Sequence, residues 1–142
     1  MRTLLVCSLL AALGAAGCSR DRTTDRASDP AGAVRVREIS VDQLDGMLAR
    51  RECQAVDANG DATRKRMGVI PGAVLLRDMD AVDQLPADKT RSLVFYCANT
   101  ACGASHEAAE KAIVAGYTRV QVLPDGIAGW VKAGKQTSAV GL

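Results

Sequence analysis

The 142-residue chain has few aromatic residues: one Trp, two Tyr and one Phe. Its core must therefore be built mainly from Val, Leu, Ile and Ala. The chain also lacks a strong charge of either sign, since its formal net charge is +2. It contains no basic stripe with interleaved aromatic residues, which is the pattern of a nucleic-acid-binding surface. These absences exclude nucleic acid from the expected partners.

No apolar run reaches the roughly 20 residues that a membrane-spanning helix needs. The run from Leu4 to Ala16 follows the basic start Met1-Arg2 and fits the apolar part of a secretory signal. We therefore predict a signal peptide over residues 1–17. The sequence Ala15-Ala16-Gly17-Cys18 resembles the lipobox of bacterial lipoproteins, with Ala15 in place of the usual leucine.

The lipobox resemblance implies that Cys18 is lipidated and becomes the mature N-terminus. Ser19 after it implies no retention at the inner membrane, so we expect a lipid-anchored protein on the periplasmic face of a bacterial membrane, with the outer membrane favoured. An ordinary signal peptide, with Cys18 left as a free thiol, is the alternative. Residues 18–33 mix both charges with small, turn-forming residues and are predicted to be the lipidated cysteine and a flexible tether.

Residues 34–142 read as one domain in which strands alternate with helices. This alternation favours an α/β fold with a parallel sheet covered on both faces. Strands are expected at 34–39, 55–58, within 68–76, at 93–96 and at 120–123. Helices are expected after Ser40, at 61–67, from Gly103 to Gly116, and at 125–134.

The stretch around Cys97 has the most chemical content. Four apolar or aromatic residues, Leu93–Tyr96, predict a buried strand, and an alanine-rich helical run begins after Gly103. Cys97 thus lies on a loop between the carboxyl end of a strand and a helix N-terminus, where ligands bind in open α/β sheets. Converging N–H groups there would hold an anion and lower the thiol pKa below about 8.5. The alternative is that Cys97 is a buried small hydrophobe.

Several segments in order resemble a rhodanese (sulfurtransferase) domain, over roughly residues 34–134. They are Val56-Asp57-Ala58, Val69-Ile70-Pro71-Gly72-Ala73, Val94-Phe95-Tyr96-Cys97 and Gly126-Ile127-Ala128-Gly129-Trp130-Val131-Lys132-Ala133-Gly134. The resemblance implies a rhodanese-like α/β fold, with a central parallel five-stranded sheet flanked by helices. It also implies that Cys97 accepts sulfur. The residues expected to bind the substrate anion are Ala98, Asn99, Thr100, Ala101 and Gly103.

One position departs from the family pattern. Rhodanese loops of this length often carry an arginine five residues after the cysteine, and here that position is Cys102. Losing a guanidinium weakens the binding of a doubly charged oxyanion such as thiosulfate. It also argues against phosphatases and arsenate reductases, whose loops need that arginine. Arg64, in the basic run Arg64–Arg66, could supply charge instead; a solvated helix face is the alternative.

Cys102 adds a second possible chemistry. It could attack a persulfide on Cys97 to form a disulfide, or it could form that disulfide directly in an oxidising compartment. We expect no metal and no cofactor, because two thiolates alone rarely make a selective metal site. His106, the single histidine, is either a helix-start residue or a proton carrier. Asp57 is expected to support the loops structurally, with a direct catalytic part as the alternative, and Cys53 to pack in the core.

The sequence therefore predicts a monomeric sulfurtransferase that moves a sulfane sulfur, through a persulfide on Cys97, to a thiol or cyanide acceptor. Its expected partners are a small sulfur-containing anion, a thiol acceptor and the membrane. The rival hypotheses are an exported thiol–disulfide module that uses the Cys97–Cys102 pair with a redox partner protein, and a catalytically idle rhodanese-like binding domain.

Overall fold

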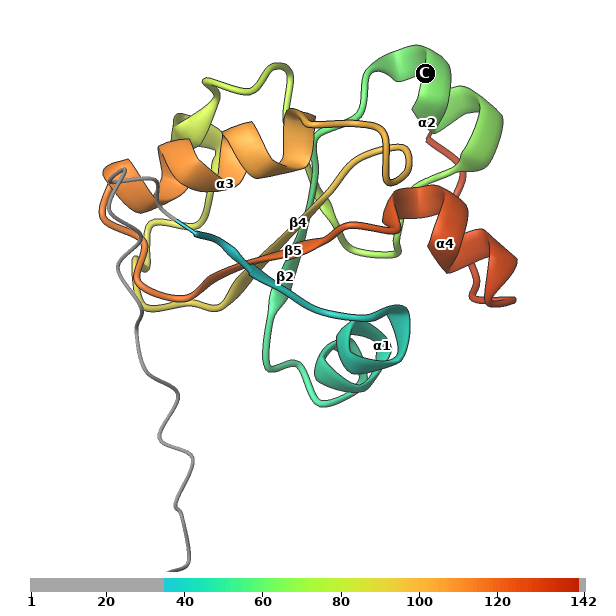
Figure 1. The fold of residues 1–142 in the computed structure, drawn as a ribbon, viewed down its shortest axis with the longest axis horizontal. Coiled ribbons are helices and arrows are strands. Elements are labelled where there is room, and N and C mark those ends of the chain that lie inside the picture. Colours follow the sequence, from blue (N-terminus) through green and yellow to red (C-terminus); the bar gives the residue numbers. More distant parts are fainter. Residues whose placement is uncertain (1–34, 141–142) are drawn as a thin grey trace, which may run out of the picture. The chain divides into compact units, whose positions relative to one another are not determined.

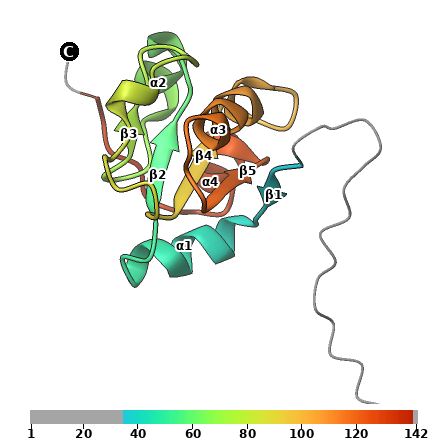
Figure 2. The same cartoon turned by 90° about the vertical axis from the view of Figure 1, so that its left-hand side faces the viewer.

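A computed structural model describes residues 35–140. They belong to a compact unit, Ala33–Leu142, whose centre is a five-stranded sheet (Figures 1 and 2). The strands lie in the order β1-β5-β4-β2-β3, and every neighbouring pair is parallel. They are β1 (Arg37–Glu38), β2 (Gln54–Asp57), β3 (Val74–Leu75), β4 (Leu93–Tyr96) and β5 (Val120–Leu123). The predicted α/β fold with five parallel strands is confirmed.

Four α-helices and one 3-10 turn connect the strands. They are α1 (Val41–Ala49), α2 (Asp61–Met67), η1 (Val82–Gln84), α3 (Ala104–Val114) and α4 (Gly126–Lys132). Helix α1 begins where the sequence indicates, because Ser40 and Gln43 form a reciprocal capping box. The first strand is shorter than the predicted range 34–39, and the edge strands β1 and β3 have two residues each. Short edges leave few unpaired backbone groups for another chain to join.

Alternating residues of the central strands pack into two cores, one on each face of the sheet. On one face, Val56, Phe95 and Val122 contact the alanine side of α3. On the other face, Val94 and Leu123 pack with residues of α1 and α4 such as Leu44. Figure 1 shows α3 on one side of the strands and α1 and α4 on the other. All four residues of β4 are buried, as expected for the middle strand of a sheet covered twice.

The connections change direction where β2 and β4 end. Strand β2 leads into α2, which contacts α4, whereas β4 leads into α3 on the opposite face. Because the chain leaves these two neighbouring strands toward opposite faces, their carboxyl ends mark the switch point at which open α/β sheets bind ligands. Cys97 follows β4 directly at this point.

The predicted signal peptide, the lipidated Cys18 and the tether lie outside the described residues. Within residues 35–140, no helix is both long and apolar enough to cross a membrane.

Candidate functional site

The loop 98–103 folds back so that Cys97 and Cys102 lie next to each other. The Cys97 Sγ atom lies 2.9 Å from the Cys102 carbonyl oxygen, to which its S–H donates, and 3.3 Å from Ser105 Oγ. Cys97 is 1% exposed, whereas Cys102 is partly exposed above it. Both thiols are free. The loop therefore stacks two sulfurs, with Cys102 nearer to solvent.

The two thiols lie close enough to interact, and this interaction separates their pKa values. Burial raises the pKa of Cys97, the neighbouring Cys102 thiol raises it further, and the hydroxyl and amide of Ser105 oppose this rise. Burial alone would also raise the pKa of Cys102, but the Cys97 S–H and the amides of Ala98 and Ala104 outweigh it, so the pKa falls. Of the pair, Cys102 is the better thiolate and Cys97 the proton donor.

This distribution corrects one expectation. The prediction that the Cys97 thiol ionises more readily than an ordinary cysteine is wrong in this structure. An amide cradle forms, but two of its N–H groups, those of Ala98 and Ala104, point at the Cys102 sulfur, and one, from Ser105, points at Cys97. The residue that replaces the family's arginine thus occupies the position that an anion would take.

The loop also satisfies part of its own backbone. Asn99 accepts the amide of Ala101 on its side chain at 3.0 Å and the amide of Cys102 on its carbonyl, also at 3.0 Å. Thr100 and Gly103 are exposed. Of the predicted anion-binding residues, Ala98 contributes an amide to the sulfur pair, while Asn99 and Ala101 hold the turn. Whether any of them binds substrate stays a prediction.

The start of α4 fixes the loop from below. The amides of Ile127 and Ala128 donate to the carbonyls of Cys97 and Ala98 at 2.8 and 3.0 Å. Gly126 has φ +59°, and a Cβ there would lie 2.7 Å from the Ala98 carbonyl carbon. Only glycine allows this approach. The sequence indicates the α4 segment through its resemblance, but nothing in its residues predicts that it grips the cysteine loop.

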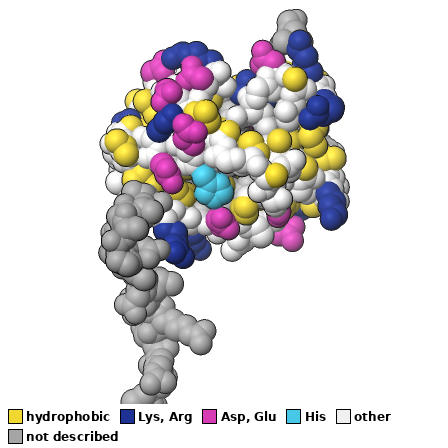
Figure 3. Space-filling model, turned by 45° about the horizontal axis from the view of Figure 1, so that its top comes forward, with side chains coloured by type: hydrophobic (Ala, Val, Ile, Leu, Met, Phe, Trp, Pro, Cys, Tyr) yellow, Lys and Arg dark blue, Asp and Glu magenta, His cyan; other side chains and the backbone are white. Residues whose placement is uncertain are grey.

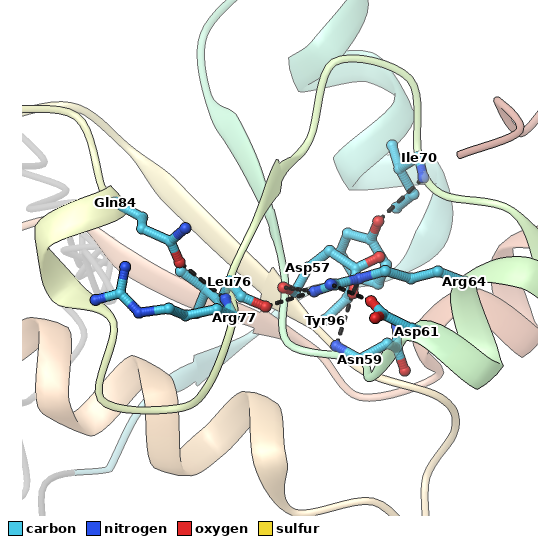
Figure 4. A network of polar contacts seen from close by, with 9 residues as sticks. All are labelled: Asp57, Asn59, Asp61, Arg64, Ile70, Leu76, Arg77, Gln84 and Tyr96. Atoms are coloured by element: carbon cyan, nitrogen blue, oxygen red, sulfur yellow. Dashed lines mark hydrogen bonds and ion pairs between the residues drawn. The ribbon is translucent and has the colours of Figure 1, made fainter. Parts of the chain in front are cut away.

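A buried ion pair supports the neighbouring loop after β2 (Figure 4). Asp57 accepts the Asn59 amide at 2.6 Å and the Arg64 Nε at 3.4 Å. Arg64 also donates to the carbonyls of Asp57 and Leu76, at 3.1 and 2.7 Å. These contacts are the ones that a structural role for Asp57 requires, and its catalytic alternative stays a prediction.

Arg64 behaves differently from both of its predicted roles. It is 6% exposed, and its guanidinium is fully engaged within the fold. It therefore neither binds substrate in this structure nor lies on a solvated helix face, and the prediction of a substrate-binding Arg64 is wrong. In the sequence, Arg64 looks like the basic residues Lys65 and Arg66 that follow it. Only the fold distinguishes them, because it buries Arg64 among hydrogen-bond partners and leaves Lys65 and Arg66 exposed.

Tyr96 is a residue of the site region to which the sequence assigned no role. It is the last residue of β4, lies opposite Asp57 in the sheet and accepts the Ile70 amide on its hydroxyl at 3.0 Å. Burial first, and then the Asp57 carboxylate, raise the pKa of Tyr96 above its ordinary value. The phenol therefore stays neutral and ties the Ile70 turn to the strand that carries Cys97.

The remaining candidates lie away from the sulfurs. His106 is on the surface near acidic side chains (Figure 3), with Nε2 3.2 Å from Glu38 Oε1. Cys53 is 4% exposed in the core at the other end of the sheet, which confirms its packing role. Trp130 is buried and donates to the Gln136 carbonyl at 2.8 Å. No group of three His, Cys, Asp or Glu side chains within residues 35–140 could hold a metal ion.

The fold and the site define an α/β domain that carries a cysteine in the loop after the middle strand of a parallel sheet. Residues 40–133 match the model of the rhodanese-like domain, and the chain belongs to this family, which is related to sulfurtransferases. A comparison with curated proteins found no match.

Solved structures share the fold at low identity. A rhodanese-like domain from an Anabaena protein is 22% identical, with a TM-score of 0.62 over 75% of this chain and 81% of that one. The thiosulfate sulfurtransferase from Pseudomonas aeruginosa is 22% identical, with a TM-score of 0.62 over 73% of this chain and 20% of that one. A 3-mercaptopyruvate sulfotransferase from Escherichia coli is 21% identical, with a TM-score of 0.59 over 76% of this chain and 53% of that one.

Proposed function

We propose that this chain is a sulfurtransferase that carries a sulfane sulfur as a persulfide on Cys97 and passes it to a thiol or cyanide acceptor. The observation that carries the proposal is the position of Cys97 directly after β4, with the loop turned back so that Cys102 and the Ser105 hydroxyl lie against its sulfur. The names of the two transferases that share the fold agree with such chemistry.

The pair supplies a proton acceptor for the first step. When a donor reaches the loop, the neighbouring Cys102, in its thiolate form, takes the proton of Cys97. The Cys97 thiolate attacks the outer sulfur of the donor and forms a new S–S bond. The donor's own S–S bond breaks, and its electron pair leaves on the departing thiolate or sulfite. The product is a persulfide on Cys97.

The second step returns the site to its starting state. An acceptor thiolate or cyanide attacks the outer sulfur of the persulfide, and the Cys97–S bond breaks toward Cys97. Cys97 recovers its proton from Cys102. The amide of Ser105 stabilises charge on the Cys97 sulfur during both steps, because it already points at this atom.

The charges near the loop favour a particular class of donor. Arg64 is bound within the fold, and Cys102 occupies the amides that would hold an oxyanion. We therefore propose organic persulfides and hydropolysulfides, whose terminal sulfur carries no second organic group, as donors in preference to thiosulfate, whose double charge needs a guanidinium or a comparable cation.

Turnover from an organic persulfide (RSSH) to cyanide, followed as thiocyanate, tests the function. We expect Cys97→Ser to lower kcat/KM at least about 1000-fold, because the nucleophile is removed. Cys53→Ala serves as the control, since this thiol lies at the opposite sheet edge and takes no part in the steps. Retained turnover in Cys97→Ser would refute the proposal.

A second candidate is a redox module that cycles through a Cys97–Cys102 disulfide, favoured by the contact between the two thiols. Thiol titration with and without reductant counts the cysteines that change state. If Cys102→Ala keeps sulfur transfer above about one tenth of wild type, the second thiol assists but does not form an obligatory disulfide. If that variant loses all activity and the wild-type protein oxidises reversibly, the redox module is the better account.

Export with lipidation at Cys18 is part of the proposal. It rests on the sequence of residues 1–18, an apolar run that ends in small residues before a cysteine. Mass spectrometry of the protein from bacterial membranes tests it: we expect an acylated Cys18 at the N-terminus, and a mature chain that keeps residues before Cys18 contradicts it.

A further inference from the structure

The amino-terminal ends of the strands lie at the end of the sheet that is farthest from Cys97. Because all the strands are parallel, the segments that enter them meet there. Backbone hydrogen bonds join these segments: Gln54 to Ser92 at 2.8 Å, Leu93 to Arg119 at 2.8 Å, and Thr118 to Lys89 at 3.1 Å. Residues 35–37, 49–53, 86–92 and 115–119 thus share one end of the domain, here called the basic edge.

The basic edge differs in charge from the rest of the domain. Its four segments hold seven basic and two acidic residues, whereas the rest of residues 35–140 holds seven basic and eleven acidic residues. The basic residues, all exposed, are Arg35, Arg37, Arg50, Arg51, Lys89, Arg91 and Arg119. The chain's small net charge therefore conceals a domain with one positive end.

The two acidic residues of the basic edge do not neutralise it. Glu52 is held by Arg50 at 2.7 Å, and Asp88 accepts the hydroxyl and amide of Thr90 at 2.6 and 2.9 Å. No ion pair involving Arg37, Arg91 or Arg119 occurs among the hydrogen-bonded and salt-bridged groups of residues 35–140. These guanidinium groups are available to an external anion.

A cavity of about 390 Å³ opens on the basic edge. Arg37 and Arg119 line it, together with Ser92 and Gln121. The side-chain oxygen of Gln121 is buried and has no hydrogen-bond partner among the described residues. Two cations on one cavity suit a ligand that carries a phosphate group, as an anionic phospholipid headgroup such as that of phosphatidylglycerol does.

The predicted tether joins the domain within the basic edge, because the chain enters the domain at Arg35. A flexible chain of 17 residues, the number from Cys18 to Val34, has a root-mean-square span of about 23 Å. With the proposed lipid at Cys18, such a tether would hold the basic edge, rather than the cysteine loop, at high concentration near the membrane surface.

We propose that the basic edge docks on a membrane surface of anionic phospholipid. Docking leaves the Cys97 loop, at the other end of the strands, directed away from the lipid and open to its sulfur donor. The interaction is electrostatic, so it weakens with salt, and it does not depend on sulfur transfer.

Binding of the unacylated chain to vesicles tests this surface. The chain from Ser19 lacks the apolar leader and Cys18 but keeps the whole compact unit, which has its own two cores. It is sedimented with vesicles of phosphatidylcholine, with and without phosphatidylglycerol, at low and high salt. We expect binding only to the anionic vesicles, and release by salt.

A matched pair of triple variants locates the binding surface. Arg37→Gln/Arg91→Gln/Arg119→Gln removes three charges from the basic edge, and Lys65→Gln/Arg66→Gln/Lys132→Gln removes three exposed charges from α2 and α4. Because each basic residue near an anionic surface contributes about fivefold, we expect the first triple to weaken partitioning about 100-fold and the second less than about threefold.

Circular dichroism establishes that both triples fold, since all six side chains are exposed. Equal weakening by the two triples would show a net-charge effect and overturn the proposal. Wild-type binding that is equal on neutral vesicles, or absent on anionic ones, would overturn it as well. In the last case an acidic protein becomes the better partner for this edge.

Discussion

The two ends of the sheet differ in the burial of their charged groups and in their thiols. At the carboxyl end, Asp57 and Arg64 are buried against each other and the backbone, and two thiols lie close together. At the amino end, Arg50 and Glu52 form an exposed pair, and Arg37, Arg91 and Arg119 have no ion pair within residues 35–140. Burial and partners, rather than residue type, decide which charges build a site and which remain free to attract a distant surface.

The buried thiols of Cys53 and Cys97 also differ through their partners. Cys53 and Cys97 are both nearly inaccessible, at 4% and 1% exposure, and lie just before β2 and just after β4. Burial raises the pKa of Cys53 to about 11, with only small contributions from Arg91 and Glu52. Cys97 has in addition a second thiol, a hydroxyl and an amide within reach. Only Cys97 has the means to lose and recover a proton.

The largest difference between the two ends is expected from their ion pairs. Asp57→Asn removes the charge that faces the buried Arg64, so we expect it to lower the free energy of unfolding by about 3 kcal/mol. Arg50→Ala breaks the exposed pair at the amino end and should change stability little. Urea denaturation of both variants measures the contrast, and equal losses would show that burial does not separate the two pairs.

Cys102 and Cys53 should differ strongly in their rates of alkylation. The lowered pKa of Cys102 gives it a larger thiolate fraction than an ordinary cysteine, so alkylation of this residue should begin at lower pH. With its pKa near 11, Cys53 should react about 100-fold more slowly than a free thiol at pH 8, and should gain reactivity only as the pH approaches 11. Peptide mapping after timed iodoacetamide labelling measures both rates. Faster labelling of Cys53 would contradict this assignment.

Two glycines with positive φ give a smaller contrast. Gly126→Ala places a methyl group against the backbone of the cysteine loop, whereas Gly116→Ala, at φ +95°, meets nothing within 4 Å. Both variants bear backbone strain of about 1 kcal/mol, and only Gly126→Ala has the added overlap. We expect it to lose about 2 kcal/mol more in thermal unfolding, together with most of the transfer activity. Equal effects of the two substitutions would mean that α4 does not hold the loop.

Much of the fold follows from local sequence. The apolar run Leu93–Tyr96 predicts the fully buried β4, and Ser40 with Gln43 marks the start of α1. The range Val120–Leu123 is predicted with the bounds that the structure has. These segments can be predicted because the sequence patterns that specify them lie within a few neighbouring residues.

The geometry of the site is harder to predict from the sequence, because its contacts join segments that are distant along the chain. The position of Cys97 after β4 follows from the sequence, but its pKa depends on how the loop returns Cys102 and the amides of Ala98 and Ala104 to it. Arg64 looks like one of three basic surface residues until the carbonyl of Leu76, 12 positions away, is placed beside it. Long-range pairings of this kind leave no local pattern.

The central claim is that a sulfane sulfur is held on Cys97. Tandem mass spectrometry of the protein, reduced beforehand and then exposed once to an organic persulfide (RSSH) without oxygen, tests it most directly. The tryptic peptide Ser92–Lys111 contains both thiols of the pair, and its fragment ions separate them. The account predicts one added sulfur atom on Cys97. An added sulfur confined to Cys102, or none on either thiol, would contradict it.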